Sequence, residues 1–276
     1  MEVINVFRVL LKKEVREALS NRWLLLYVLL FAGLGVGFAY YSSMGLSTLG
    51  FRIFGRVSAA IVNMNLYLIP LLAMFLTGLS IVGEREKGTV EFLLAQPVSK
   101  TEVLISKYLG ALTSITIATT LGYGITAWYL WFFLSASDLA VFLQIIGESI
   151  LLAAVLSAVG TAVGTMSKSR FQALAIILTL WFSMLIIFDL ALMAFVMLAN
   201  PDAPTLFTLM TLNPAEASRL LMIYSIDPTL LLLGPISVYV ARSIGGSLPL
   251  LLLATQAAWI TTLLTISTIV FRKQDM

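Results

Sequence analysis

Six apolar runs, each long enough to cross a lipid bilayer, restrict what this chain can fold into. They cover approximately residues 23–41, 59–82, 108–133, 139–166, 171–198 and 248–271. A helix needs about 20 mostly apolar residues to cross the hydrocarbon core. Of the 276 residues, 60% are hydrophobic and 11% are charged, compared with roughly 25% charged in a soluble domain. The sequence therefore predicts an all-α, polytopic membrane protein with six transmembrane helices in a single membrane domain, residues 1–276.

The residues before the first run predict a different kind of helix. Between residues 3 and 20, apolar Val6, Val9 and Leu10 are interleaved with charged side chains at helical spacing. Such a segment is too polar to cross a bilayer, but its apolar face can lie in the interface. We therefore expect an amphipathic helix along the membrane surface.

The distribution of basic residues predicts which side of the membrane each loop occupies. Short cytoplasmic loops carry an excess of lysine and arginine. Of the 17 basic residues, four fall outside the N-terminal helix and its junction, the 83–107 segment, the 167–170 turn and the tail: Arg52, Arg56, Arg219 and Arg242. We therefore expect a cell-membrane protein whose two termini and 83–107 segment are cytoplasmic. The net charge of +3 indicates this orientation rather than a nucleic-acid partner.

The segment between the fifth and sixth runs, residues 199–247, is expected to have structure of its own on the outer face. Asn213-Pro214-Ala215-Glu216 is typical of a helix start, with Asn as the N-cap and Pro at the first helical position. Asp227-Pro228 repeats the signal, Pro235 should bend or end that second helix, and Gly245-Gly246 should stop it. The sequence therefore predicts two short outer-face helices.

Composition excludes most catalytic chemistry. The chain has no cysteine and no histidine, which removes thiol and Ser-His nucleophiles and the usual zinc sites. No G-x-x-x-x-G-K-[ST] motif occurs, so no nucleotide site is expected in this chain. We therefore predict no catalytic residues, no metal site and no cofactor here, and any energy source must lie on another chain.

The segment from Gly83 to Val103 is the longest charged insertion and the best candidate for receiving that energy. Its first charged residues are expected to meet water or a partner: Glu84, Arg85, Glu86 and Lys87. Phe92, Leu93 and Leu94 follow as an apolar group that a free loop has no reason to expose. A solvated turn that only fixes topology is the alternative, and it leaves that apolar group unexplained.

This segment, GEREKGTVEFLLAQPVSKTEVLISKYLG, resembles the hallmark segment of the type-2 ABC exporter permeases, the ABC-2 family. The six-crossing plan and the N-terminal helix, which is similar to the family's elbow helix, extend the resemblance over the whole chain. Shorter segments resemble the NosY-type permeases, which serve maturation of the copper enzyme nitrous oxide reductase. These segments are Asn21-Arg22-Trp23, WFSMLIIFDLALM from Trp181 and LNPAEASRLLMI from Leu212.

The resemblance implies partners. The permease would be a homodimer in membrane lipid, each copy carrying one cytoplasmic ATP-binding subunit on which ATP and magnesium bind. The family's coupling helix corresponds here to Glu84–Leu94. NosY-type systems also have a β-helical partner outside the membrane, which would lie over residues 199–247 and meet Asn213, Glu216 and Arg219. Copper passage is not supported, because scattered methionines are the only soft ligands.

Glu148 and Asp189 are the only acidic residues well inside the apolar runs. Each lies about ten residues, or roughly 15 Å, from the outer end of its helix. They are either a polar pair at a gate or substrate path, or separate structural acids satisfied by hydroxyl and backbone groups of packed helices. The sequence leaves both interpretations open.

Three classes of function follow. The leading one is a permease subunit driven by a separate ATPase, which supports copper enzyme maturation by transport or by transmitting motion, or exports a drug, lipid or other small molecule. An ion-coupled secondary transporter would favour internal repeats, and none is evident. An intramembrane aspartyl protease needs two aspartates in the spans, and only Asp189 is present.

Overall fold

The computed structural model describes residues 2–20, 22–44, 53–88, 98–134, 139–230 and 235–274. These residues form helices and short connections, and no β-strand occurs among them. Six helical segments are long and apolar enough to cross a membrane. The all-α, six-span prediction is therefore confirmed.

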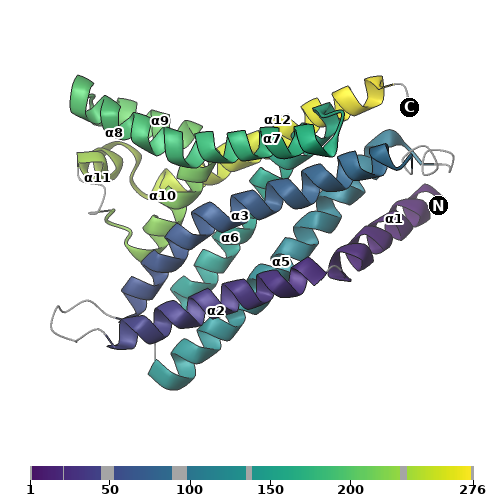
Figure 1. Cartoon of the computed structure of the whole chain (residues 1–276). Coiled ribbons are helices and arrows are strands. Elements are labelled where there is room, and N and C mark those ends of the chain that lie inside the picture. Colours follow the sequence, from purple (N-terminus) through teal and green to yellow (C-terminus); the bar gives the residue numbers. More distant parts are fainter. Residues whose placement is uncertain are drawn as a thin grey trace.

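Each described helix that precedes the fifth span is one uninterrupted segment. These helices are α1 (Glu2–Leu19), α2 (Arg22–Met44), α3 (Ile53–Glu86), α5 (Lys100–Leu134) and α6 (Leu139–Met166). The N-terminal amphipathic segment is thus a helix, and its placement on the membrane surface stays a prediction. Figure 1 shows α1, the end of α3 and the end of α12 gathered at one end of the bundle, with both termini.

The fifth span contains a local change of helix type. It runs through α7 (Arg170–Phe182), a π-helical turn (Ser183–Ile187) and α8 (Phe188–Ala199). A π-turn widens a helix and leaves its carbonyls in altered positions, and such turns are frequent at functional sites. The sequence analysis did not anticipate it, because one extra residue in a helix leaves little trace in an apolar run.

The outer segment has more pieces than expected. It consists of α9 (Ala203–Leu212), α10 (Pro214–Ile226), α11 (Pro235–Tyr239), a π-turn (Val240–Ile244) and a 3₁₀ turn (Gly245–Ser247), after which the sixth span, α12 (Leu248–Lys273), begins. The Asn213 side chain caps α10 as predicted, accepting a hydrogen bond from the Ala215 N–H. The prediction that a second helix begins at Pro228 was wrong. Asp227 instead accepts from the Thr229 N–H in a turn, and Pro235 starts α11.

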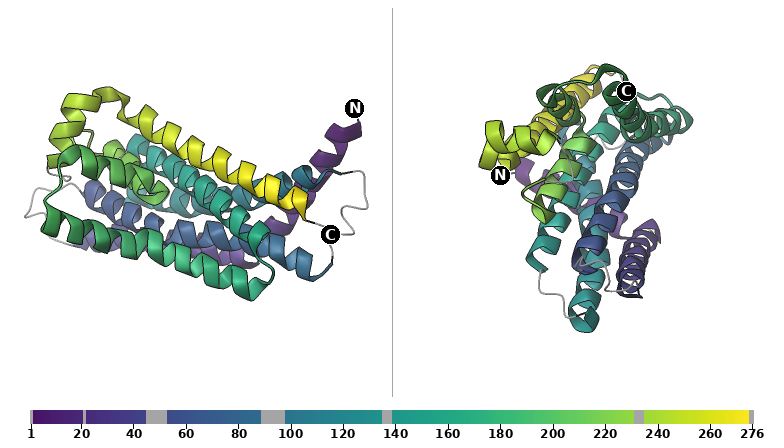
Figure 2. Two further views of the ribbon diagram at one scale, coloured as in Figure 1. Left: turned by 90° about the horizontal axis from the view of Figure 1, so that it is seen from above. Right: turned by 90° about the vertical axis from the view of Figure 1, so that its left-hand side faces the viewer.

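The core of the bundle lies between α3 and α6, the pair of described helices in most extensive contact. Small residues allow this approach: a Cβ added at Gly160 would lie 2.7 Å from the Met74 backbone. The fifth and sixth spans, by contrast, lie mostly outside this core. Figure 2 shows α12 running along the outside of the bundle.

A buried polar cluster ties three spans together inside this core. Asn65 of α3 donates to the Ser149 hydroxyl of α6 at 2.6 Å, and Tyr123 of α5 donates to the Asn65 side-chain oxygen. All three residues are fully buried. Because each polar atom finds a partner within the bundle, the cluster fixes the register of α3, α5 and α6 at small cost.

Candidate functional site

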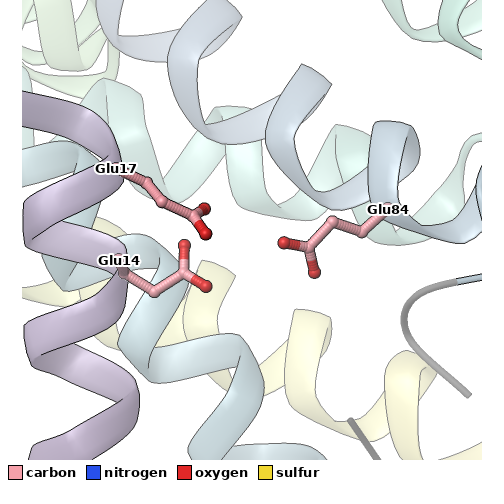
Figure 3. Close-up of side chains that lie close together, drawn as sticks. All are labelled: Glu14, Glu17 and Glu84. Carbon is pink, nitrogen blue, oxygen red and sulfur yellow. The ribbon is translucent and has the colours of Figure 1, made fainter. Parts of the chain in front are cut away.

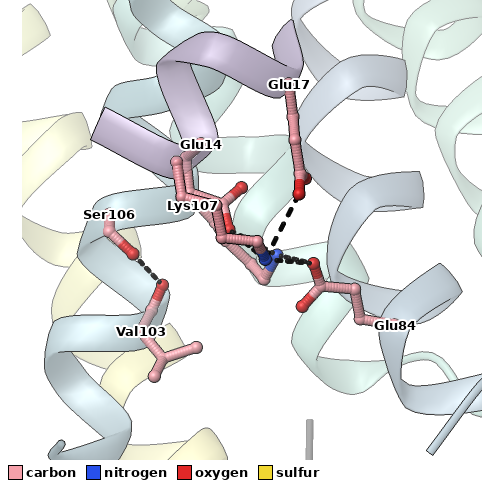
Figure 4. A network of polar contacts seen from close by, with 7 residues as sticks. Glu14, Glu17, Glu84, Val103, Ser106 and Lys107 are labelled. Atoms are coloured by element: carbon pink, nitrogen blue, oxygen red, sulfur yellow. Dashed lines mark hydrogen bonds and ion pairs between the residues drawn. The ribbon is translucent and has the colours of Figure 1, made fainter. Parts of the chain in front are cut away.

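The charged end of α3 is fixed to the N-terminal helix by a buried lysine. Lys107 of α5 places its Nζ 2.7 Å from Glu84 Oε1 and 3.3 Å from Glu14 Oε1 of α1. The Lys107 side chain is 3% exposed. The network joins α1, α3 and α5 (Figure 4), so the elbow-like helix is attached at the residue where the predicted coupling segment begins.

Glu14, Glu17 and Glu84 point toward one another from α1 and α3 (Figure 3). Their oxygens lie within 4.8 Å of one another, close enough for a metal ion. Lys13 supplies a second positive charge, with its Nζ 3.5 Å from Glu14 and Glu17 and 3.7 Å from Glu84. Burial lowers the pKa of Lys13, but the nearby carboxylates together raise it by a larger amount, so the net shift of the pKa is upward. Two lysines thus offset most of the charge of the three glutamates.

The next residue, Arg85, holds the end of α3 to a different neighbour. Its guanidinium donates to the carbonyl oxygens of Ser167 at 2.8 Å and Thr165 at 3.3 Å, which belong to the end of α6 and its turn. It also donates to Gln274 Oε1 at 2.5 Å, just after α12. The carbonyls at a helix end lack intrahelical donors, so this arginine satisfies groups that would otherwise need water.

Glu86 makes a third attachment, and Lys87 makes none in the described residues. The Glu86 carboxylate lies 3.2 Å from Arg170 Nε and accepts from the Arg170 N–H at 2.8 Å, at the start of α7. These residues were expected to meet water or a partner protein, and in the structure Glu84, Arg85 and Glu86 each bind a different helix of their own chain, while Glu86 also stays exposed. Lys87 is exposed as expected. Phe92, Leu93 and Leu94 lie outside the described residues.

Gln274 connects two parts of the charged segment, residues 83–103. Its Oε1 accepts from Arg85, near the start of the segment, and its backbone carbonyl accepts from Lys100 Nζ at 2.5 Å, near the end. Its Nε2 donates to the Thr165 carbonyl at 2.7 Å. One residue after the last span therefore holds the start and the end of the segment to α6.

Replacing Gln274 with alanine should release the start of the segment, because it removes the side-chain hydrogen bonds to Arg85 and Thr165 and keeps the backbone carbonyl that accepts from Lys100. The two lost side-chain hydrogen bonds contribute about 1 kcal/mol each, so local opening at this point should become roughly thirtyfold more frequent. We expect tryptic cleavage after the exposed Lys87 to accelerate by that factor in the purified protein. Thr265→Ala is the control, because that exposed hydroxyl on α12 bonds only within its own helix. Equal cleavage rates in parent and Gln274→Ala would contradict this role.

At the other end of the bundle, Asp189 forms an ion pair that the sequence analysis did not foresee. Arg219 of α10 places one guanidinium nitrogen 3.2 Å from Asp189 and the other 3.0 Å from Glu216. Burial raises the pKa of Glu216 to about 7, with Arg219 opposing that shift and Asp189 adding to it. Arg219 thus stabilises two carboxylates and fixes α10 to the fifth span.

Asn213, Glu216 and Arg219 were expected to meet an outer partner, and the structure turns them inward. Asn213 donates to the Met184 carbonyl at 2.7 Å, inside the π-turn of the fifth span. Glu216 is fully buried and Arg219 is largely buried. Direct docking through Asn213 or Glu216 is therefore disfavoured, and the role that remains for these residues is to hold the outer segment on the spans.

Of the two interpretations left open for Glu148 and Asp189, the structure favours separate acids, because each has a partner of its own on α10. Glu148 Oε1 accepts from the Ser225 hydroxyl of α10 at 2.6 Å, whereas Asp189 is paired with Arg219. The sequence analysis did not anticipate that α10 brings an arginine from the 199–247 segment to Asp189.

The comparisons with known proteins agree with this arrangement of helices. The family described as ABC-2 family transporter protein matches residues 8–276. The chain belongs to the ABC-2 transporter family. This membership supports an ABC transporter permease over an ion-coupled secondary transporter.

Two curated relatives of this ABC-2 protein extend over nearly its whole length. The chain is 31% identical over 258 residues to "Probable ABC transporter permease protein NosY" of Pseudomonas aeruginosa, covering 90% of this chain and 89% of that protein. It is 30% identical over 274 residues to the protein of the same name from Stutzerimonas stutzeri, covering 95% and 96%. It is therefore an ABC transporter permease subunit similar to NosY, with six apolar helices of a multi-pass membrane protein.

Two of the segments that carried the NosY resemblance meet in the fold of this ABC-2 permease. The segment from Trp181 contains Met184 and Asp189. The segment from Leu212 contains Asn213, which binds Met184, and Arg219, which binds Asp189.

The sequence analysis did not identify Lys107 and Gln274 as residues of the site. A lone lysine in the apolar stretch VLISKYLGAL was a usable signal, since a buried lysine needs a carboxylate partner. No sequence signal identified Gln274.

Proposed function

We propose that this ABC-2 permease is driven by a separate cytoplasmic ATP-binding subunit that docks on the segment from Glu84 to Leu94. The supporting observation is the set of attachments at its start. Glu84, Arg85 and Glu86 are consecutive. Glu84 binds α5 and α1, Arg85 binds the end of α6 and Gln274, and Glu86 binds α7. A displacement of the segment would therefore act on four helices together rather than bend one loop.

The permease would supply no chemistry of its own. ATP and magnesium would bind the partner subunit, and ATP binding and hydrolysis there would change the position of the docked segment. The buried Lys107–Glu84 contact transmits that displacement to the N-terminal helix, because a paired buried charge resists separation from its partner. In this arrangement the termini are cytoplasmic, in keeping with the basic residues clustered at this end.

We further propose that the subunit acts as a homodimer in a NosY-like system that supports maturation of a copper enzyme. The mostly exposed apolar faces of the fifth and sixth spans offer surfaces for lipid and for a second copy. The attachment of α10 to the fifth span through Arg219 favours transmission of motion to a partner outside the membrane. That partner would contact exposed parts of residues 199–247 rather than the buried Asn213 and Glu216.

Export of an apolar small molecule or lipid is the second candidate. A cavity of about 650 Å³ lies between α6, the fifth span and α12, and its lining is almost entirely apolar, including Val159, Leu180 and Trp259. Such a cavity suits an apolar substrate or a lipid chain.

Purification from native membranes should recover the permease with a stoichiometric ATP-binding subunit. Vanadate-sensitive ATP hydrolysis should accompany the complex and be absent from the permease alone. A permease that is active and contains no second subunit would contradict the proposal. A bound extracytoplasmic protein in the same preparation would favour the NosY-like role over export of a small molecule.

A further inference from the structure

A second cavity, separate from the apolar one, contains a carboxylate. It has a volume of about 400 Å³ and lies between α6, α10 and the first turns of α12. Leu151, Leu221 and Leu253 supply apolar walls from these three helices, and Glu148 and Ser225 supply polar groups. The volume falls within the range of small-ligand sites, which combine apolar walls with a few placed polar groups.

Glu148 is only half satisfied within this cavity. Its Oε1 accepts from Ser225 at 2.6 Å, while its Oε2 is buried and has no hydrogen-bond partner among the described residues. No lysine or arginine is among the described residues that line the cavity. A buried carboxylate oxygen without a donor is costly, and an ionisable group in a membrane span is retained mainly where it meets a partner.

These features define the ligand that would complete the site. A group that donates hydrogen bonds and carries positive charge would satisfy the free oxygen by a charge-assisted hydrogen bond. An ammonium has three such donors, and it can donate to the free Oε2 while Oε1 keeps its hydrogen bond from the Ser225 hydroxyl. The leucine walls require an apolar body on the same molecule.

We propose that this cavity binds the ammonium group of an aliphatic amine, with the hydrocarbon part of the ligand against the three leucines. Pro249, in the first turn of α12, also lines the cavity, which places it near one end of the sixth span. Membrane headgroups lie at such helix ends. The same chemistry can therefore come from the ethanolamine headgroup of a lipid or from a free lipophilic amine, and the site goes beyond the proposed coupling function.

Binding to the purified full-length permease tests the site without any ATPase partner. Hexylamine should bind the parent at least tenfold more tightly than hexanol, which has the same apolar body without the charge. Glu148→Gln should weaken hexylamine binding at least tenfold and leave hexanol binding unchanged. Glu102→Gln, a carboxylate on the exposed first turn of α5, is the matched control and should bind like the parent.

Native mass spectrometry with phosphatidylethanolamine and phosphatidylglycerol distinguishes the sources. Binding of phosphatidylethanolamine that depends on Glu148 supports a lipid ligand, and hexylamine binding without it supports a free amine. Leu253→Trp, which fills the cavity but leaves Glu148, should abolish binding of both and serves if Glu148→Gln does not fold. Failure of both amines to bind the parent, or binding to Glu148→Gln or Leu253→Trp that equals the parent, would overturn the proposal.

Discussion

Replacing Lys107 with methionine should destabilise the permease by roughly 3 kcal/mol, because it leaves buried carboxylates without their counter-charge. The Lys107 side chain is 3% exposed and contacts both Glu84 and Glu14. Lys13 stays near the same carboxylates but is partly exposed, so it replaces only part of the lost charge. The expected result is a lower midpoint of thermal unfolding in detergent and a reduced yield of folded protein.

Two further variants identify the cause of this loss. Lys87→Met removes an exposed lysine from the same end of the bundle and should leave the unfolding midpoint within error of the parent. Adding Glu84→Gln to Lys107→Met removes one of the two stranded charges and should recover part of the stability. A Lys107→Met protein as stable as the parent would mean that the network contributes little and that the attachment of α1 rests on apolar contacts.

The six spans follow directly from the sequence, because each apolar run is long enough to have no other stable environment than lipid. The partners of the charged residues do not follow. The sequence places Glu84 and Lys107 in the 83–107 segment between two apolar runs, but it does not show that α3 and α5 bring them 2.7 Å apart. The sequence analysis therefore expected Glu84, Arg85 and Glu86 to meet water or a partner, and it did not foresee their contacts with neighbouring helices of the same chain.

The outer segment shows the same limit in another form. The capping signal at Asn213 was strong enough to predict α10, since a side-chain acceptor before Pro is a local property. The position of that helix against the spans depends on tertiary packing, and this position decides which polar side chains meet. Because α10 packs against the spans, Arg219 reaches Asp189 and Ser225 reaches Glu148. The two acids thus have separate environments that neither sequence position alone could indicate.

Changing Phe92 to aspartate should uncouple the permease from its ATP-binding subunit. We expect Phe92 to enter a groove on that subunit, since the GEREKGTVEFLLAQ segment resembles the family's coupling segment and Phe92 begins its apolar group. An unpaired charge in a desolvated interface should weaken binding about a hundredfold, in the range of a strong interface hot spot. The readouts are co-purification of the ATP-binding subunit and ATP hydrolysis that depends on the permease.

The substitution should leave the membrane domain intact, because Glu84, Arg85 and Glu86 still attach the start of the segment to its neighbouring helices. The unfolding midpoint should therefore equal that of the parent, which separates this variant from Lys107→Met. Phe92→Leu keeps an apolar side chain and should retain most of the binding. If Phe92→Asp still binds the ATP-binding subunit and supports hydrolysis at the parental rate, the apolar group at 92–94 is not the docking element. The exposed Lys87 would then be the next residue to test, because it lies on the same segment and has no partner among the described residues.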